Sequence, residues 1–336
     1  MCWDSDVIGP GRGYVISIAD EGEFGLIRRV TARLGGAPST PGVLLGPGDD
    51  AAVLAAPDGR VVASTDLMVE GRHFRRDWSS GHDVGRKAAA ANLADVVAMG
   101  ARPTALLIGF AAPGELDLDW VDAFVDGLRT ECASVGATVV GGDVVAADRV
   151  MVAVTALGDL AGRSPLTRAG ARPGDAVVLI GAPGRAAAGL ALLRAGYDQP
   201  PADAHRHPEP RYEDALALAG SGVATAMIDT SDGLFADLGH IAQASGVRVE
   251  LRAADLPIDP EVRAAAELLG ADPVEWALGG GDDHCFAATV QADAAESAIR
   301  IGEVRSAVDG GVPEVVLVDR VAPRLGGHAH FADPGQ

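Results

Sequence analysis

The stretch Gly48-Asp49-Asp50-Ala51-Ala52-Val53, followed after a short gap by Ser64-Thr65-Asp66, sets acidic and hydroxyl side chains beside apolar runs. Asp49 and Asp50 follow a Gly-Pro-Gly turn, and Asp66 lies just beyond the apolar run 61–63. A single Asp-Asp pair most often marks a turn. Strand ends that present Asp, Ser and Thr oxygens nevertheless suit hard divalent cations, which prefer oxygen ligands.

Further aspartates occur in comparable places along the chain. Asp95, Gly142-Asp143 and the run Asp229-Thr230-Ser231-Asp232-Gly233 each stand beside a strand-like or helix-like segment. Asp95 lies in an apolar helical segment, where a buried charge needs a partner or a metal ion. Either Ser231 or Asp232 could simply cap the following helix. Taken together, these segments predict a magnesium and phosphate site assembled from distant parts of the chain.

Length and composition limit the classes of protein to consider. A chain of 336 residues predicts about two domains. With 27 basic and 47 acidic residues the net charge is −20, which disfavours nucleic acid and anionic membranes as partners. The three cysteines are scattered, which argues against a structural zinc and favours a reducing compartment. The sequence shows neither a signal peptide nor an apolar run long enough to cross a bilayer, so we expect a cytoplasmic protein.

Periodicity predicts mixed helices and strands, and therefore an α/β (α+β) fold with mixed sheets and flanking helices. We expect an irregular extension at 1–19, an N-terminal domain at 20–158 and a C-terminal α/β domain at 159–336. The first predicted helix starts at Glu21. Further helices are predicted at 84–99, 119–135, 184–195, 211–220, 233–244, 260–269, 272–278 and 292–301. The predicted strands cover 43–46, 51–56, 61–65, 104–110, 137–141, 150–157, 176–181, 225–229, 247–251, 285–290 and 314–318. Residues 197–210 are expected to form a surface loop.

Several common phosphate-binding and catalytic motifs are absent from the sequence. It contains no P-loop, no protein-kinase motif set and no Gly-x-Ser-x-Gly elbow. Bound phosphates would therefore depend on carboxylate-held metals and on arginine. Arg168 suits a phosphate by charge and fork geometry, although an interdomain salt bridge is an equally good interpretation. Lys87 could pair with Asp95, contact a phosphate, or lie on the surface.

Six motifs occur in a fixed order along the chain. They are Gly-Asp-Asp-Ala-Ala-Val, Ser-Thr-Asp-Leu-Met-Val-Glu-Gly-Arg-His-Phe, Asn-Leu-Ala-Asp-Val-Val-Ala-Met-Gly-Ala-Arg-Pro, Gly-Gly-Asp-Val, Leu-Thr-Arg-Ala-Gly-Ala-Arg-Pro-Gly-Asp and Asp-Thr-Ser-Asp-Gly-Leu. With these motifs, the chain from about Glu21 to Phe331 resembles the thiamine-monophosphate kinase family of the aminoimidazole-ribonucleotide-synthetase-like superfamily. The resemblance implies two α/β domains, a homodimer joined through the N-terminal sheets, and transfer of the ATP γ-phosphoryl group to thiamine phosphate, giving thiamine diphosphate.

The resemblance also implies roles for particular residues. Several Mg2+ ions would be held by Asp50, Ser64, Thr65, Asp66, Asp95, Asp143, Asp229 and Asp232. ATP would be bound by Gly142, Asp143, Arg168 and Ser231. Phosphoryl transfer would depend on Asp66, Asp95, Asp143 and Arg168. Thiamine phosphate would contact His73, Asp282 and His328.

Two segments depart from the family pattern. Asp282-Asp283-His284-Cys285 stands where the family usually has Glu-Asp-Tyr-Glu, and Gly327-His328-Ala329-His330-Phe331 stands where it has Gly-Trp/Tyr-Asp-His-Phe. An imidazole can still stack on a thiamine ring, but with less area than Trp. These changes bear on substrate affinity rather than on phosphoryl transfer.

The acceptor suggests a mechanism. A phosphate monoester has a second pKa of about 6, so its oxygen is mostly deprotonated near neutral pH and needs no side-chain base. We therefore expect direct transfer without a phosphoenzyme. Two alternatives stay open: a sibling enzyme such as aminoimidazole ribonucleotide synthetase or selenophosphate synthetase, and a nucleotide-binding regulatory module without turnover. The missing N-terminal Cys/Sec-Lys pair argues against selenophosphate synthetase, Val-Glu-Gly-Arg-His-Phe argues against aminoimidazole ribonucleotide synthetase, and only the altered segments favour the regulatory module.

Overall fold

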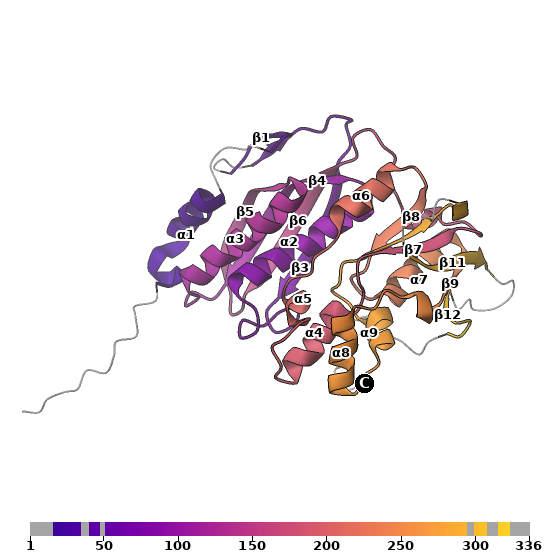
Figure 1. Ribbon diagram of the computed structural model, residues 1–336. Helices are drawn as coiled ribbons and strands as arrows, with labels where there is room; N and C mark the ends of the chain where they lie inside the picture. Colours follow the sequence, from indigo (N-terminus) through magenta and orange to yellow (C-terminus); the bar gives the residue numbers. More distant parts are fainter. Residues whose placement is uncertain (1–15, 35–39, 48–50, 294–298, 308–314, 323–336) are drawn as a thin grey trace, which may run out of the picture.

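The protein has two sheets, each accompanied by helices, arranged side by side (Figure 1). The computed structural model describes residues 16–34, 40–47, 51–293, 299–307 and 315–322. A four-stranded sheet lies in the N-terminal half and a six-stranded sheet in the C-terminal half. This architecture confirms the predicted α/β (α+β) class with mixed sheets.

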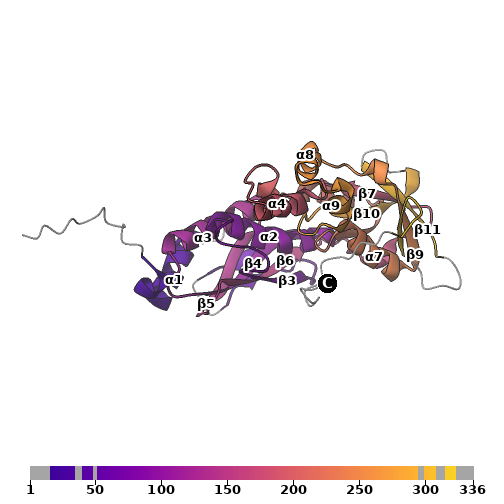
Figure 2. The same ribbon diagram turned by 90° about the horizontal axis from the view of Figure 1, so that it is seen from below.

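The N-terminal half is built around the four-stranded sheet. Its elements are α1 (Ile18–Leu34), β1 (Val43–Leu45), β2 (Val53–Leu54), β3 (Val62–Val69), α2 (Gly81–Ala98), β4 (Arg102–Ala112), α3 (Leu118–Val135), β5 (Thr138–Ala146) and β6 (Met151–Asp159). The strand order is β3-β6-β4-β5, in which β6 pairs antiparallel with β3 and β4, and β4 runs parallel to β5. The helices α2 and α3 lie together along one face of the sheet (Figure 2).

Glycines allow α2 and α3 to pack backbone against backbone. A Cβ atom at Gly85 would lie 2.1 Å from the carbonyl oxygen of Phe124, and one at Gly127 would lie 2.1 Å from that of His82. The start of α2 is fixed by a capping box, in which the Ser80 and Asp83 side chains each bond to the backbone N–H of the other residue. These two features hold α2, which carries Asp95, firmly against the rest of the half.

The C-terminal half surrounds the six-stranded sheet, whose order is β12-β9-β11-β7-β10-β8. Only the β9–β12 pair is parallel. The elements are η1 (Arg168–Gly170), β7 (Ala176–Ile180), α4 (Arg185–Arg194), α5 (Ala202–Arg206), α6 (Tyr212–Gly220), β8 (Ala224–Asp229), α7 (Leu234–Ser245), β9 (Val247–Leu251), η2 (Ala253–Asp255), α8 (Pro260–Leu269), α9 (Pro273–Gly279), β10 (Phe286–Val290), β11 (Ile299–Ser306) and β12 (Val316–Val318).

Three local predictions are wrong. The helix predicted at 292–301 is contradicted where it meets β11, because Ile301 is buried in a strand paired with both β7 and β9. The surface loop predicted at 197–210 contains the short helix α5. The irregular extension predicted at 1–19 ends earlier than expected, since α1 already begins at Ile18. In the first case sheet pairing outweighed local helix propensity.

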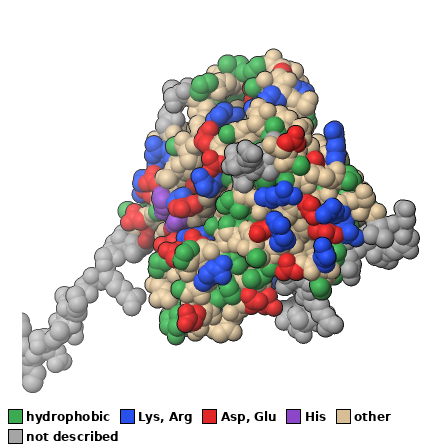
Figure 3. Space-filling model, turned by 45° about the vertical axis from the view of Figure 1, so that its right-hand side comes forward, with side chains coloured by type: hydrophobic (Ala, Val, Ile, Leu, Met, Phe, Trp, Pro, Cys, Tyr) green, Lys and Arg blue, Asp and Glu red, His purple; other side chains and the backbone are tan. Residues whose placement is uncertain are grey.

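One hydrophobic cluster spans both halves, and a second cluster lies within the C-terminal half. The cluster that contains Leu93 of α2 and Phe124 of α3 continues into Tyr212, Met227 and Phe286 of the C-terminal half. The Tyr212 hydroxyl also donates a hydrogen bond of 2.9 Å to Glu131 of α3. The junction between the halves is therefore packed rather than loosely linked. Figure 3 shows acidic and basic side chains interspersed over one outer face, so the net negative charge is not gathered there.

Candidate active site

Strand β3 presents its polar residues to two different faces of the N-terminal sheet. The Ser64 hydroxyl donates a hydrogen bond of 2.5 Å to Asp95 Oδ2 on α2. Because side chains alternate along a strand, Asp66 shares the face of Ser64. The backbone N–H of Asp66 donates to Asn92 Oδ1 at 3.0 Å, which fixes this strand against α2. Thr65 points the other way and pairs with Thr155, whose hydroxyl donates to that of Thr65 at 3.1 Å.

Asp95 lies among other carboxylates from both halves of the chain. Burial raises its pKa to about 7, the negative charges of Asp229 and Asp66 add to the rise, and the Ser64 hydrogen bond and the charge of His284 oppose it. The three aspartates come from α2, the end of β8 and β3. The negative charges of two of the predicted metal-binding residues, Asp66 and Asp229, therefore act on a third, Asp95, and a cation would relieve this repulsion.

The loop after β8 is fixed by hydrogen bonds to the segment before β10. Asp229 is buried, and its Oδ2 lies 3.0 Å from Nδ1 of the equally buried His284. Burial alone lowers the pKa of His284, but the hydrogen bond and charge of Asp229 raise it above its usual value. The backbone N–H of Asp282 donates to the carbonyl of Ser231 at 2.9 Å. This hydrogen bond connects Ser231, which is predicted to bind ATP, with Asp282, which is predicted to bind thiamine phosphate.

Asp282 and His73 are held close to one another by Lys87. The Lys87 ammonium donates to Asp282 Oδ2 at 2.9 Å and to the carbonyl of His73 at 3.1 Å. Burial raises the pKa of Asp282, but the charge and hydrogen bond of Lys87, together with the charge of His284, outweigh this effect and hold that pKa well below its usual range. Lys87 is buried and pairs with Asp282, so the interpretations of Lys87 as a partner of Asp95 and as a surface lysine are both wrong.

Gly142 and Asp143 lie on β5, beside Ile108 and Gly109 of β4. A Cβ atom at Gly142 would lie 2.1 Å from the Ile108 carbonyl oxygen, so the two strands approach closely only because this residue is glycine. Strand alternation places Asp143 on the face of Thr65 rather than that of Asp66. Asp143 is exposed, and its Oδ1 accepts the Val144 N–H at 2.9 Å.

Arg168 and Ser231 are exposed residues of the C-terminal half. The Arg168 carbonyl accepts the Ser245 hydroxyl at 2.7 Å, while its guanidinium has no carboxylate partner among the described residues. The interdomain salt bridge considered above is therefore not found in this part of the chain. Among the described residues, neither Arg168 nor Asp143 forms a hydrogen bond or ion pair with Asp95 or Asp229. Asp50 and His328 lie outside the described residues.

Comparison with known proteins follows the same division into two parts. Residues 48–160 match the AIR synthase related protein, N-terminal domain, and residues 172–307 match the AIR synthase related protein, C-terminal domain. Thiamine-monophosphate kinase of Mycobacterium tuberculosis is 49% identical over 301 residues, which cover 89% of this chain and 88% of that protein.

The chain belongs to the thiamine-monophosphate kinase family.

Solved structures of family members have the same fold. Thiamine-monophosphate kinase from Stenotrophomonas maltophilia K279a matches with a TM-score of 0.75 and 35% identity, covering 89% of this chain and 96% of that one. The structure described as AaThiL complexed with AMPPCP and TMP also gives a TM-score of 0.75, at 30% identity, covering 95% and 100% of the two chains. That kinase therefore holds an ATP analogue and TMP within the fold found here. No described helix of this chain is both long enough and apolar enough to span a membrane.

Two aspartates that support the site, Asp237 and Asp283, are not among the site residues predicted from the sequence. Asp237 is buried in α7, and its Oδ2 accepts the backbone N–H groups of Asp232 and Gly233 at 3.2 and 3.0 Å. Burial raises its pKa to about 7, helped by the charges of Asp229 and Asp232. Its position on the apolar stripe of a helix was the available signal, because a carboxylate there must be buried.

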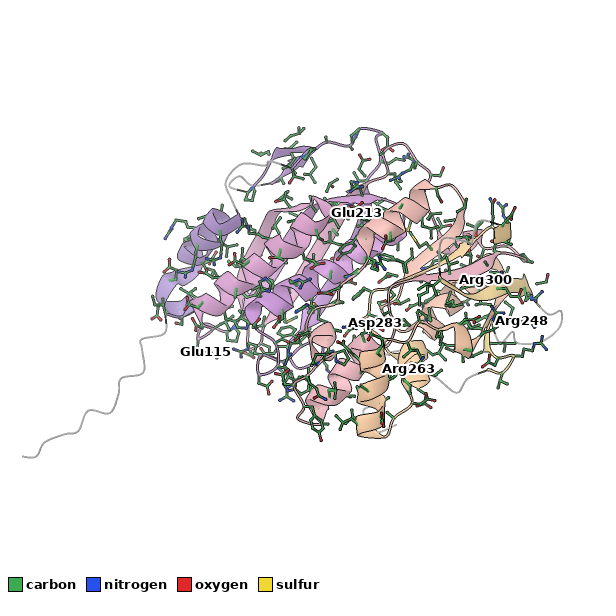
Figure 4. All side chains as sticks on the ribbon, in the orientation of Figure 1. Glu115, Glu213, Arg248, Arg263, Asp283 and Arg300 are labelled. Atoms are coloured by element: carbon green, nitrogen blue, oxygen red, sulfur yellow. The ribbon has the colours of Figure 1, made fainter. Side chains whose placement is uncertain are left out.

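Asp283 is the second aspartate that the sequence analysis did not identify as a site residue. Its two carboxylate oxygens accept the backbone N–H groups of Gly184 and Ala186 at 2.5 and 2.7 Å, at the start of α4. Burial raises the pKa of Asp283 to about 7. The residue lies at the junction of the two halves (Figure 4) and borders a cavity of about 530 Å3 whose lining also includes His284 and Cys285. In this family member the segment 282–285 thus supports both the carboxylate cluster and the adjoining helix.

Proposed function

We propose that this protein is a thiamine-phosphate kinase, which transfers the γ-phosphoryl group of ATP to thiamine phosphate and forms thiamine diphosphate. The observation that carries the proposal is the convergence of Asp66, Asp95 and Asp229 from both halves of the chain. It is supported by relatives that bear this name and by the family structure that contains AMPPCP and TMP. Phosphoryl transfer between two anions requires such a site, because their charge must be neutralised before they can meet.

The donors present fit magnesium. Asp66, Asp95 and Asp229 offer carboxylate oxygens and Ser64 offers a hydroxyl, which are ligands that a hard cation prefers. Repulsion among the carboxylates, which contributes to the raised pKa of Asp95, is what a divalent cation would remove. Mg2+ ions bound there would neutralise phosphate charge and orient the reacting groups. The wider proposed set is Asp50, Ser64, Asp66, Asp95, Asp229 and Asp232, with Thr65 and Asp143 on the opposite face of the sheet.

The protein's own residues orient this site. The Ser64 hydroxyl fixes one oxygen of Asp95, and the His284 ring fixes one oxygen of Asp229. We place the ATP phosphates near Gly142, Asp143, Arg168 and Ser231, and thiamine phosphate near His73, Asp282 and His328. The proposal for Arg168 is supported by an exposed guanidinium that no described carboxylate neutralises. Because thiamine phosphate is already deprotonated near pH 7, the transfer is direct and in line, with no phosphoenzyme.

The test is to identify the product. Purified protein incubated with ATP, thiamine phosphate and Mg2+ is expected to release thiamine diphosphate and ADP, and to release neither without Mg2+. Asp95→Ala should abolish turnover while the circular dichroism spectrum is retained. ATP consumption without thiamine diphosphate would indicate a sibling enzyme, and ATP binding without consumption a regulatory module; either result contradicts the proposal. Label from γ-labelled ATP that stays on the denatured protein would contradict direct transfer.

We also propose a homodimer joined through the open face of the N-terminal sheet. This face, on the side opposite α2 and α3, carries the exposed apolar side chains Leu67, Leu107 and Val145. Their exposed fractions are 52%, 37% and 63%. A sheet face with clustered apolar side chains is typical of a surface that another protein covers. A second copy of the same face would bury it symmetrically.

Two further assignments belong with this proposal. Residues 20–158 would form the ATP-binding and dimerisation domain and 159–336 the domain that completes the site, which the family matches at 48–160 and 172–307 support. We propose the cytoplasm as the compartment, because Cys132 and Cys285 are both buried free thiols.

A further inference from the structure

Lys87 is the one lysine in the sequence, and it is buried where charged side chains are rarely found. Only 3% of its side chain is exposed. Its ammonium group donates three hydrogen bonds, to Asp282 Oδ2 at 2.9 Å and to the carbonyl oxygens of His73 and His205, each at 3.1 Å. An ammonium has three N–H donors, so all of its hydrogen-bonding capacity is used within the protein.

These three acceptors belong to separate segments around the proposed thiamine phosphate site. His73 follows β3 in the N-terminal half, His205 lies in α5, and Asp282 precedes β10. Ala204, directly before His205, and Asp283, directly after Asp282, line the cavity of about 530 Å3. Lys87 itself lies in α2, two turns before Asp95. One buried cation thus connects the helix that carries Asp95 to the segments on the opposite side of the site.

We propose that Lys87 is a positioning residue for thiamine phosphate, which acts by holding Asp282 and the His73 segment in the geometry that binds this substrate. Lys87 engages Oδ2 of Asp282, so that Oδ1, on a side chain that is 39% exposed, is the atom directed to the substrate. The proposal rests on the proposed function and deepens it by explaining how two distant substrate-side residues are kept together.

The backbone around these residues supports a positioning role. Asp282 has a φ of 65°, a conformation that non-glycine residues rarely adopt, and its N–H donates to the Ser231 carbonyl. His73 is oriented separately, because its Nδ1 accepts the Val69 N–H at 3.0 Å and the proton of the neutral ring therefore lies on Nε2. Lys87 adds a charged connection between these two segments. Removing it would leave the Asp282 carboxylate without the cation that fixes its direction.

The test compares substrate-specific kinetics. Lys87→Met, which keeps the length of the side chain, is expected to raise the KM for thiamine phosphate by at least about tenfold and to leave the KM for ATP within about twofold. Asp282→Asn should act on the same KM. If Lys87 works through Asp282, the double variant Lys87→Met/Asp282→Asn should be no worse than the weaker-binding single variant. Arg102→Met is the matched control, since it removes an exposed ion pair with Glu213 that also joins the two halves; it should leave both KM values unchanged.

The outcomes separate this inference from the proposed function. A wild-type protein that makes no thiamine diphosphate overturns the proposed function and this inference with it. An active wild type with an unchanged Lys87→Met variant, with both KM values raised together, or with fully multiplicative effects in the double variant overturns only the positioning role. Should Lys87→Met fail to fold, Lys87→Arg decides the question: retained thiamine phosphate affinity supports positioning by a cation, and equal loss of both substrates contradicts it.

Discussion

At the scale of single residues, Asp95, Asp237 and Asp283 share one property. Burial raises the pKa of each to about 7 from an ordinary value of 3.8. A carboxyl whose pKa is higher in the folded than in the unfolded state binds its proton more tightly when folded. Folding is therefore favoured by protonation of these groups, and this contribution is lost as the pH rises.

The first prediction concerns the pH dependence of stability without metal. In EDTA, the free energy of unfolding should fall as the pH rises from about 4 to about 7, the interval between the unfolded and folded pKa values. Asp95→Asn should flatten this fall, because the amide cannot ionise, and Mg2+ should restore the stability of the wild type above pH 7. Thermal melts at several pH values measure the effect. Parallel curves for wild type and Asp95→Asn would show that Asp95 is not the strained carboxyl described here.

Some site residues could be predicted from their immediate sequence and others could not. Asp95 and Asp229 interrupt or end apolar runs, so the sequence itself indicates that their charges are forced toward the interior, whereas Asp66, just beyond an apolar run, is exposed. The Lys87–Asp282 pair joins residues 195 positions apart, and no local pattern encodes that contact. Asp283 has no helix-capping pattern because it caps α4 from a distant segment. Its function depends on the tertiary fold.

At the scale of elements, the close packing of α2 on α3 supports the helix that carries Asp95. Glycines on the facing sides of the two helices allow their backbones to come close together. The sequence alone does not reveal this packing, because an isolated glycine in a helical run indicates only weaker helix formation. Local reasoning also failed at β11, where an alanine-rich stretch favours a helix but Ile301 and Val304 fill a strand position between β7 and β9. In both cases long-range packing decided the structure.

The second prediction tests the helix pair. Gly85→Ala should lower the free energy of unfolding by about 2–4 kcal/mol, since the new methyl group would lie 2.1 Å from the Phe124 carbonyl oxygen and force the helices apart. Gly239→Ala is the control, because this helical glycine has its nearest neighbours at 3.9–4.0 Å. The control should be neutral or stabilising by up to about 1 kcal/mol. Equal effects of the two substitutions in urea unfolding would refute the packing argument.

At the scale of the whole molecule, the two halves are joined because one hydrophobic cluster spans both of them and because Asp229 of one half acts on Asp95 of the other. The order of the motifs in the sequence was sufficient to predict this general architecture. It was not sufficient to show that Thr65 and Asp143 occupy the face of the sheet opposite Asp66. That arrangement depends on the strand register, which only the structure gives.

The third prediction concerns assembly. Leu107→Glu places a charge in the centre of the open sheet face and should convert the proposed homodimer into a monomer, because burying an unpaired carboxylate at an interface is strongly unfavourable. Light scattering after size-exclusion chromatography measures the mass directly. Leu268→Glu, at a comparably exposed leucine of α8, should leave the dimer intact. A wild type that is already monomeric at micromolar concentration, or a Leu107→Glu variant that stays dimeric, would exclude this face as the interface.

The central claim is that aspartates from both halves form one cation site, and Mn2+ binding measured by electron paramagnetic resonance in the presence of a non-hydrolysable ATP analogue tests it most directly. Asp95→Asn and Asp229→Asn, one from each half, should each weaken Mn2+ binding by at least about tenfold. Asp119→Asn, at an aspartate of α3 whose side chain is 92% exposed, should leave binding unchanged. Mn2+ binding that stays at the wild-type level in both Asp95→Asn and Asp229→Asn would contradict the account.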